Sequence, residues 1–261
     1  PWVCRSCTSC AGGSAAAALA RSGVTVLDDA GRVVGLLAKR YGKAVPIKAN
    51  RGVVLATGSF AYNQKMIEAH APRLIGRPGA AIEEHDGRAI LVAQALGADT
   101  AHMDATEVAF FGDPQMMARG ILVNGRGQRY IAEDTYPGRI GQATLIQQEN
   151  QAYLVMDEES YEAAQATETS TPFFRVPPKW VCESVAELEA EMRLLAMTLQ
   201  STVECYNHHA AAGEDPVLGK KSEWCKPIGT PIAAWDMRGF TAGFTLGGLR
   251  TDLDSRVLHV S

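Results

Sequence analysis

The chain has 261 residues, of which 46% are hydrophobic and 21% charged, the composition of an ordinary folded protein with a sizeable core. Its 25 basic and 29 acidic residues give a net charge of −4, which excludes a global positive field that would attract nucleic acid or an anionic membrane surface. No apolar run reaches the roughly 18 to 20 residues of a membrane helix, and the first residues lack the apolar core of a signal peptide, so we expect a cytoplasmic protein.

The first residues of the chain are rich in cysteine. Cys4, Cys7 and Cys10 have the C-x2-C-x2-C spacing with which some iron–sulfur motifs begin, but Ser14 stands where the fourth ligand is expected. A histidine from elsewhere could complete a zinc site, although isolated matches of this kind are weak evidence. The sequence therefore favours no metal site. The remaining cysteines are expected to be reduced, small apolar residues: Cys182, Cys205 and Cys225.

An alanine-rich stretch follows, opened by Gly13 and closed by Gly23. A helix opened by glycine and followed by the apolar run at 24–27 is similar to the second half of a dinucleotide-binding βαβ unit. In that unit a pyrophosphate lies on the helix N-terminus. If Gly13 is the third glycine of G-x-G-x-x-G, however, Thr8 and Cys10 occupy the first two positions. The stretch is either a degenerate cofactor motif that retains Gly13 or an ordinary alanine-rich helix.

Residues 24–58 predict a small β-meander that leads into a buried strand. Short apolar runs at 24–27 and 32–37 flank an Asp/Gly turn, and a third run follows at 45–48. The next run, at 53–60, is apolar and β-branched and ends in small residues. This pattern is typical of a buried strand whose end approaches a ligand, because glycine leaves room for close contact with backbone.

Two helices are predicted after this run. Asn63 is expected to cap a helix over 64–70. Asp86 is expected to cap a second helix that runs to Leu96, with Gly97 as its C-terminal stop.

Further along, residues 121–131 have the pattern of a hairpin. Ser184 and Glu187 then form a capping box. His208 and His209 predict surface or C-terminal capping roles rather than a metal site, because no carboxylate motif lies nearby. Apolar residues at helical spacing after the capping box are expected to face the core: Val185, Leu188, Met192, Leu195, Leu199 and Val203.

Four segments of the chain together resemble one family of flavoproteins. In chain order they are the run at 53–59, the helix opened by Asp86 and closed at 96–99, the 120–133 segment that ends in Arg-Tyr-Ile-Ala-Glu, and residues 244–249. Their order and spacing are similar to the flavoproteins that include fumarate reductases, succinate dehydrogenases, aspartate oxidases and 3-ketosteroid dehydrogenases. The resemblance covers about residues 24–261.

The resemblance implies a mixed α/β and α+β protein in which an FAD-binding domain is interrupted by an α+β capping domain. On this chain it implies a partial FAD-binding domain over 1–106, a substrate-capping domain over 107–235, and a truncated return to the FAD-binding domain over 236–261. Ser59 replaces the usual second glycine of the family pattern. Besides Gly13, the residues expected to line FAD are Ala56, Thr57, Gly58, Ser59, Asp86, Thr245, Leu246, Gly247 and Gly248.

The resemblance also implies an active-site turn at 133–139. Fumarate reductases carry an arginine acid there and ketosteroid dehydrogenases a tyrosine; Tyr136 falls at the tyrosine position, and Arg139 is displaced from the arginine position. A tyrosine hydroxyl can bind substrate or exchange a proton with it while flavin takes a hydride. The alternative interpretation of Tyr136 is a turn residue that packs over Pro137.

The expected substrate follows from Phe244, which stands where fumarate reductases generally have a histidine for a substrate carboxylate. An apolar ring there favours a flat hydrophobic substrate, as in the 3-ketosteroid 4-dehydrogenases. The predicted function is thus FAD-dependent dehydrogenation of a steroid-like 3-ketone. The alternatives are fumarate reductase-like reduction of an unsaturated acid, and a catalytically silent fragment that serves only binding or oligomerisation. The sequence assigns no electron acceptor.

Overall fold

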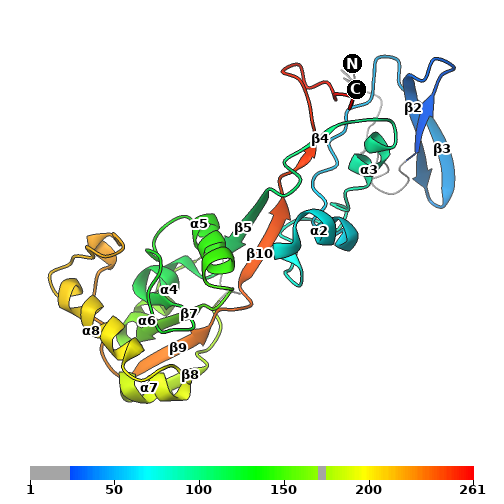
Figure 1. Ribbon diagram of the computed structural model, residues 1–261. Coiled ribbons are helices and arrows are strands. Elements are labelled where there is room, and N and C mark those ends of the chain that lie inside the picture. The colour runs from blue at the N-terminus through cyan, green and yellow to red at the C-terminus, as the bar shows by residue number, and fades with distance from the viewer. Residues whose placement is uncertain (1–23, 170–174) are drawn as a thin grey trace. The chain divides into compact units, whose positions relative to one another are not determined.

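The computed structural model describes residues 24–169 and 175–261 (Figure 1). The chain divides into two compact units, Pro1–Glu107 with Gly243–Ser261, and Val108–Ala242. The mixed α/β and α+β class predicted from the sequence is confirmed. Gly13 and the cysteines at 4, 7 and 10 lie outside the described residues, so their predicted roles stay predictions.

The first unit begins with the predicted β-meander. Three antiparallel strands follow each other in the sheet in the order β1-β2-β3. Their first turn is closed by Asp28, whose carboxylate accepts hydrogen bonds from the backbone N–H groups of Ala30 and Arg32. The bounds are β1 (Val24–Leu27), β2 (Val33–Arg40) and β3 (Lys43–Lys48).

The run at 53–60 is not a strand, so this prediction was wrong. It has no regular secondary structure in the described chain. Val53 is buried against Leu36 and Ala38 of the meander, whereas Val54 is 44% exposed. An apolar run becomes a central strand only where neighbouring strands supply its hydrogen bonds, and the described residues supply none.

Both predicted helices of the first unit are present. Asn63 caps α2 (Gln64–His70) by accepting a hydrogen bond from the N–H of Met66. For α3 (Arg88–Gln94) the predicted cap needs correction, because Gly87 occupies the N-cap position with φ +69°. The carboxylate of Asp86 still accepts the N–H of Arg88 at 3.0 Å. The remaining elements of this unit are η1 (Pro72–Leu74), β4 (Thr100–Ala101) and β11 (Gly248–Leu249), of which β4 and β11 pair.

The chain passes between the two units along β5 (Thr106–Phe110) and β10 (Thr241–Thr245), which pair with each other. The sequence predicts a capping domain over 107–235, and the second compact unit extends to residue 242. Its role as a cap stays a prediction.

The second unit is built on an antiparallel sheet of order β6-β7-β9-β8. Successive side chains of a strand point to opposite faces, so Ile121 and Val123 join α7 and α8 in one core cluster, whereas Leu122 joins α4, α5 and α6 in the other. Helices therefore cover both faces of the sheet (Figure 1). The strands are β6 (Ile121–Val123), β7 (Tyr153–Asp157), β8 (Trp180–Cys182) and β9 (Ile232–Asp236). The helices are α4 (Pro114–Arg119), α5 (Pro137–Gln142), η2 (Ala143–Gln147), α6 (Glu158–Ala166), α7 (Val185–Glu191), α8 (Thr198–Ala210) and η4 (Ser222–Trp224).

The predicted hairpin at 121–131 forms only its turn. The N–H of Asn124 donates to the carbonyl of Gln128, and one isolated bridge joins Val123 to Arg129. The strand partner of β6 is β7 instead. The outer N–H of β6, at Leu122, donates to the carboxylate of Glu133, so a side chain takes the place of the second arm.

The predicted apolar stripe of residues 185–203 is divided between two helices. The capping box is present, since the N–H of Glu187 donates to Ser184 Oγ. Leu188 and Leu199 are fully buried, but Leu195 lies in the connection between α7 and α8 and is 75% exposed. Its predicted place in the core was therefore wrong.

The start of α8 explains the break between the two helices. The buried carboxylate of Glu189, on α7, accepts hydrogen bonds from the N–H groups of Met197 and Leu199 at 2.7 Å each. A new helix thus begins where this carboxylate satisfies its free N–H groups.

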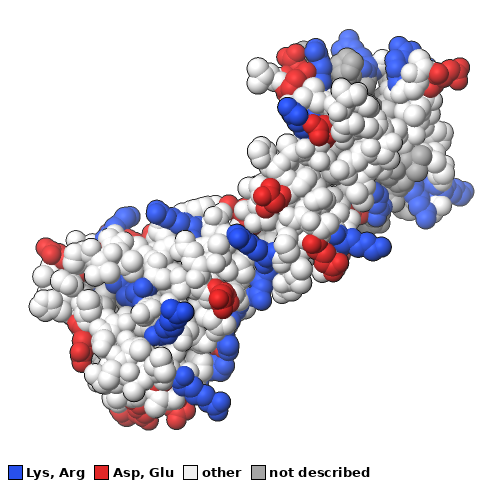
Figure 2. All heavy atoms as spheres, viewed as in Figure 1, with Lys and Arg blue, Asp and Glu red and all other residues white. Residues whose placement is uncertain are grey.

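No helix among the described residues is both long enough and apolar enough to span a membrane. On the face drawn in Figure 2, basic and acidic side chains are both scattered among uncharged ones over the two units.

We predict that Leu199→Ala lowers the free energy of unfolding by about 3 kcal/mol, because it leaves a cavity in a fully buried cluster. Leu195→Ala is the matched control and should change it by about 0.5 kcal/mol or less, since that side chain is exposed. Urea denaturation of both variants measures the difference. Equal losses would contradict the division of the stripe.

Candidate functional site

A cavity of about 390 Å³ lies in the first unit. The segment 54–58 lines it together with the start of α3, strand β11 and part of residues 251–257. Its volume is within the roughly 300–1,000 Å³ of small-molecule sites. Among the described residues that line it, none is charged, and the hydroxyl groups belong to Thr57, Thr251 and Ser255. The cavity therefore suits an uncharged group.

Four of the residues predicted to bind the cofactor meet at this cavity: Ala56, Thr57, Gly58 and Gly248. A Cβ added at Gly248 would have no heavy atom within 4 Å, so its backbone borders open space. At position 58 the backbone conformation and a close neighbour both require glycine. Its φ is +77°, and a Cβ there would lie 2.4 Å from the ring of His85.

The other predicted cofactor residues do not line this cavity. Thr245 is buried and its hydroxyl accepts a hydrogen bond from the N–H of Phe60 at 3.0 Å, which fixes the end of the 53–60 run. Asp86 pairs with Arg88. Gly247 lies against backbone, since a Cβ there would be 2.2 Å from the carbonyl oxygen of His102. Two more lie elsewhere in the unit: Ser59, 3.4 Å from His85, and Leu246, 58% exposed.

The predicted substrate residue, Phe244, lies on β10 and is half-buried. It belongs to the first unit, whereas the predicted active-site turn belongs to the second.

The turn at 133–139 leads into α5 in the second unit. Tyr136 occupies the N-cap position, and its carbonyl accepts hydrogen bonds from the N–H groups of Arg139 and Ile140 at 2.9 and 3.2 Å. The side chain of Tyr136 is 69% exposed, and Arg139 is exposed as well. Both side chains are therefore accessible at the start of α5. Glu133, at the other end of the turn, is only 2% exposed.

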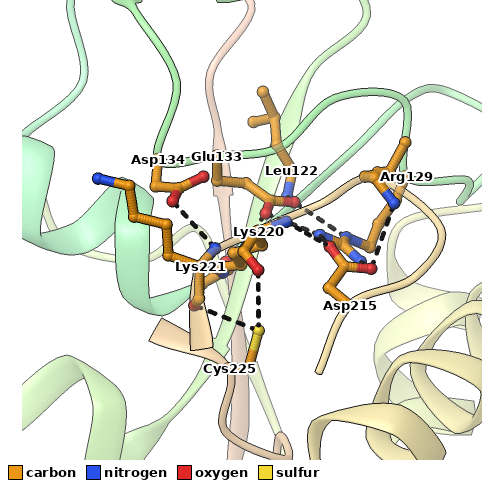
Figure 3. A network of polar contacts seen from close by, with 10 residues as sticks. Leu122, Arg129, Glu133, Asp134, Asp215, Lys220, Lys221 and Cys225 are labelled. Carbon is orange, nitrogen blue, oxygen red and sulfur yellow. Dashed lines mark hydrogen bonds and ion pairs between the residues drawn. The ribbon is translucent and has the colours of Figure 1, made fainter. Parts of the chain in front are cut away.

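Glu133 belongs to a buried ionic cluster that sequence analysis did not find (Figure 3). Arg129 donates to both oxygens of Glu133, at 3.0 and 2.9 Å, and to both oxygens of Asp215, at 3.2 and 2.9 Å. Lys220, whose side chain is fully buried, lies 3.4 Å from Glu133 and donates to the carbonyl of Gly120. Two cations thus face two anions. Asp215 and Lys220 lie more than 80 residues along the chain from their partners, Arg129 and Glu133. No local spacing in the sequence predicts such a pairing.

The cluster shifts the ionisation of its members. Burial by itself raises the pKa of Asp215, but hydrogen bonds and the charge of Arg129 outweigh it and hold the pKa below its usual value. Burial lowers the pKa of Lys220, against the attraction of Glu133. For Arg129 burial acts in the same direction, but Glu133 and Asp215 prevail and raise its pKa.

Comparison with known proteins gives the family. Residues 13–260 match the FAD binding domain family. The chain belongs to this family. The predicted flavoprotein resemblance and the prediction of FAD as the cofactor are thereby confirmed.

Individual relatives agree with this assignment. The structure is similar to a 3-ketosteroid-Δ4-(5α)-dehydrogenase of Rhodococcus jostii, solved in complex with 4-androstene-3,17-dione, with a TM-score of 0.85 and 72% identity over 91% of this chain and 49% of that one. A 3-oxosteroid 1-dehydrogenase of Mycobacterium tuberculosis is 26% identical over 82% of this chain and 45% of its own length. An NADH:acrylate oxidoreductase of Vibrio harveyi is 25% identical over 88% of this chain and 24% of its own length. The chain thus spans about half, or less, of these relatives.

The residues around the 390 Å³ cavity fit part of an FAD molecule. A flat ring can lie on the backbone at Gly248, where a side chain would fill the space. The uncharged lining fits a ring system rather than a pyrophosphate, which needs convergent N–H or cationic donors. Ala56, Thr57, Gly58 and Gly248 are the residues that would hold it.

We predict that Gly248→Leu weakens FAD binding at least about tenfold, because the new side chain enters the cavity. Flavin titration followed by absorbance measures the dissociation constant. Gly239→Leu is the matched control, since a Cβ there also meets no atom within 4 Å but lies in the second unit. Unchanged affinity in Gly248→Leu would contradict this position for the cofactor.

The lowered pKa of Asp215 makes stability depend on pH. The folded pKa lies below the unfolded value of about 3.9, so the ion pair's contribution is complete above that pH and is lost as pH falls through the folded pKa. We predict that Asp215→Asn reduces the difference in unfolding free energy between pH 7 and pH 3. Urea denaturation at both pH values tests this. Asp254→Asn, at a carboxylate 70% exposed, should keep the wild-type difference.

Proposed function

We propose that the chain is part of an FAD-dependent dehydrogenase that oxidises a CH–CH bond beside the ketone of a hydrophobic 3-ketosteroid. The observation that carries this proposal is the 72% identity to the 3-ketosteroid-Δ4-(5α)-dehydrogenase, sustained over 91% of the chain. The acrylate relative matches at 25%. Identity of this size favours the steroid branch over fumarate reductase-like reduction.

Bound FAD supplies a hydride acceptor. The chain's own residues would bind and orient it, with the backbone of Gly58 and Gly248 and the uncharged side chains of the cavity against a neutral ring. A lining without charged side chains retains little water. Exclusion of water suits a reaction that water would disturb. Phe244 supplies an apolar surface for the hydrophobic substrate. A carboxylate substrate would instead need a cation at this position.

Tyr136 is the residue we propose for proton exchange with the substrate. Its phenol is accessible at the start of α5. A hydroxyl there can donate a hydrogen bond to the ketone oxygen or exchange a proton at the carbon beside it. Arg139, exposed one turn along the same helix, supplies positive charge near the developing enolate.

The first test is made on the purified 261-residue chain. After incubation with excess FAD and desalting, a chain that fits the proposal retains flavin absorbance and converts a saturated 5α-3-ketosteroid to the conjugated enone with an artificial electron acceptor. Fumarate with a reduced dye is the comparison substrate. A folded chain that keeps no flavin would show that these 261 residues are not an oxidoreductase by themselves. A flavin-loaded chain that reduces fumarate and leaves the steroid unchanged would contradict the proposal.

We predict that Tyr136→Phe lowers kcat for the steroid by about 10²- to 10⁴-fold, because the proton-exchanging hydroxyl is lost while the ring remains. Steady-state kinetics and flavin retention are measured together, and flavin retention should not change. Tyr41→Phe is the matched control, at a tyrosine that is 92% exposed on the meander. Equal kcat values in both variants would exclude the assigned role.

A further inference from the structure

We propose that the buried cluster formed by Arg129, Glu133, Asp215 and Lys220, together with Asp134, positions Tyr136 for the reaction. This inference rests on the proposed function, in which Tyr136 contacts the substrate. The members of the cluster are positioning residues, because they act through the backbone of the turn that carries the tyrosine.

The N-terminal end of the turn is fixed from three directions. The carboxylate of Glu133 accepts the N–H of Leu122 on β6 at 2.9 Å, two hydrogen bonds from Arg129, and an ion pair from Lys220. Both Glu133 and Lys220 have fully buried side chains. A carboxylate held by a strand, by a residue four positions earlier and by a distant loop has one orientation available.

The neighbouring Asp134 attaches the turn to the same distant loop. Its Oδ2 atom accepts the N–H of Lys221 at 3.1 Å, as Figure 3 shows. The loop is itself held, because Asp215 accepts the N–H of Lys220 and the thiol of Cys225 donates to the carbonyls of Lys220 and Lys221. Two consecutive residues of the turn are therefore bound to one fixed support.

The C-terminal side of Tyr136 is fixed by packing. Tyr136 opens α5, and a Cβ added at Gly141 of that helix would lie 2.3 Å from the carbonyl oxygen of Val108 on β5. The helix thus lies directly on backbone. Only Thr135 separates Tyr136 from the anchored Asp134. The backbone of Tyr136 is held on both sides while its ring is 69% exposed.

The cost of the cluster favours a positioning role over a stabilising one. Burying two cations and two anions gains little net stability compared with well-packed apolar residues. Ion pairs and hydrogen bonds instead fix the orientation of the groups that they join. A displacement of about 1 Å at a reacting group can reduce a rate about 10²-fold. A fixed orientation is therefore most valuable in a turn that presents one reactive side chain.

The experiment uses Asp134→Ala, which removes the acceptor for Lys221 N–H at a half-buried side chain. Glu133→Gln would leave buried cations uncompensated and is expected to unfold the second unit. In the FAD-loaded chain, Asp134→Ala should lower kcat for the steroid about 10- to 100-fold with little change in KM. Asp134→Asn keeps an oxygen acceptor and should restore most of kcat. Glu204→Ala, an exposed carboxylate on α8, is the control and should match wild type.

A double-mutant cycle separates positioning from general damage. If Asp134 acts through Tyr136, Asp134→Ala should have no further effect on kcat in the Tyr136→Phe background. Equal fold-losses in both backgrounds would overturn the proposal.

A second readout does not depend on turnover. The N–H groups of Arg139 and Ile140, which donate to the carbonyl of Tyr136, should exchange with deuterium about tenfold faster in Asp134→Ala, while those of α7 stay unchanged. If the wild-type chain binds FAD but leaves steroids unoxidised, the proposed function fails, and this exchange rate alone decides whether Asp134 holds the turn. Unchanged exchange would overturn the positioning role.

Discussion

The second unit depends on one constraint, which is that its four-stranded sheet must be buried on both faces. Side chains of each strand alternate between two core clusters, and this is why β6, β7 and β9 consist almost wholly of apolar residues. The helices then follow as covers, α7 and α8 on one face and α4, α5 and α6 on the other. With its faces covered, the sheet can meet polar groups only along its edge. At that edge β6 donates to Glu133, so the candidate active-site turn begins at the rim of the core.

Local signals in the sequence predicted the local structure well. The meander, the Asn63 cap and the Ser184 capping box were found because each depends on residues at most a few positions apart. The 53–60 strand failed because strand formation requires partners, and the hairpin after β6 failed because Glu133 replaced one. Leu195 has the correct spacing for a core position, but Glu189 starts a new helix and turns the connection outward. In each failure the outcome depended on contacts with other segments, which were present at Glu133 and Glu189 and absent at 53–60.

The candidate site divides in the same way. The family resemblance pointed to Ala56, Thr57, Gly58 and Gly248, which meet at one cavity. The same resemblance placed Thr245 beside the cofactor, which stays a prediction, and the sequence did not show that its hydroxyl accepts the N–H of Phe60. The buried cluster escaped prediction because a charged residue in a polar loop is ordinarily solvated, and only tertiary structure brings Lys220 to Glu133.

The pairing of β4 with β11 has a consequence for synthesis on the ribosome. Ala101 and Gly248 are neighbours in the first unit, yet the whole second unit is translated between them. The second unit can therefore complete its core while the first still lacks a strand, since domains fold as units while the chain emerges. During that interval the hydroxyl of Thr245 is not yet available to the N–H of Phe60, so the end of the 53–60 run lacks this hydrogen bond. Residues 24–107 are thus synthesised before the second unit but complete their pairing only after it.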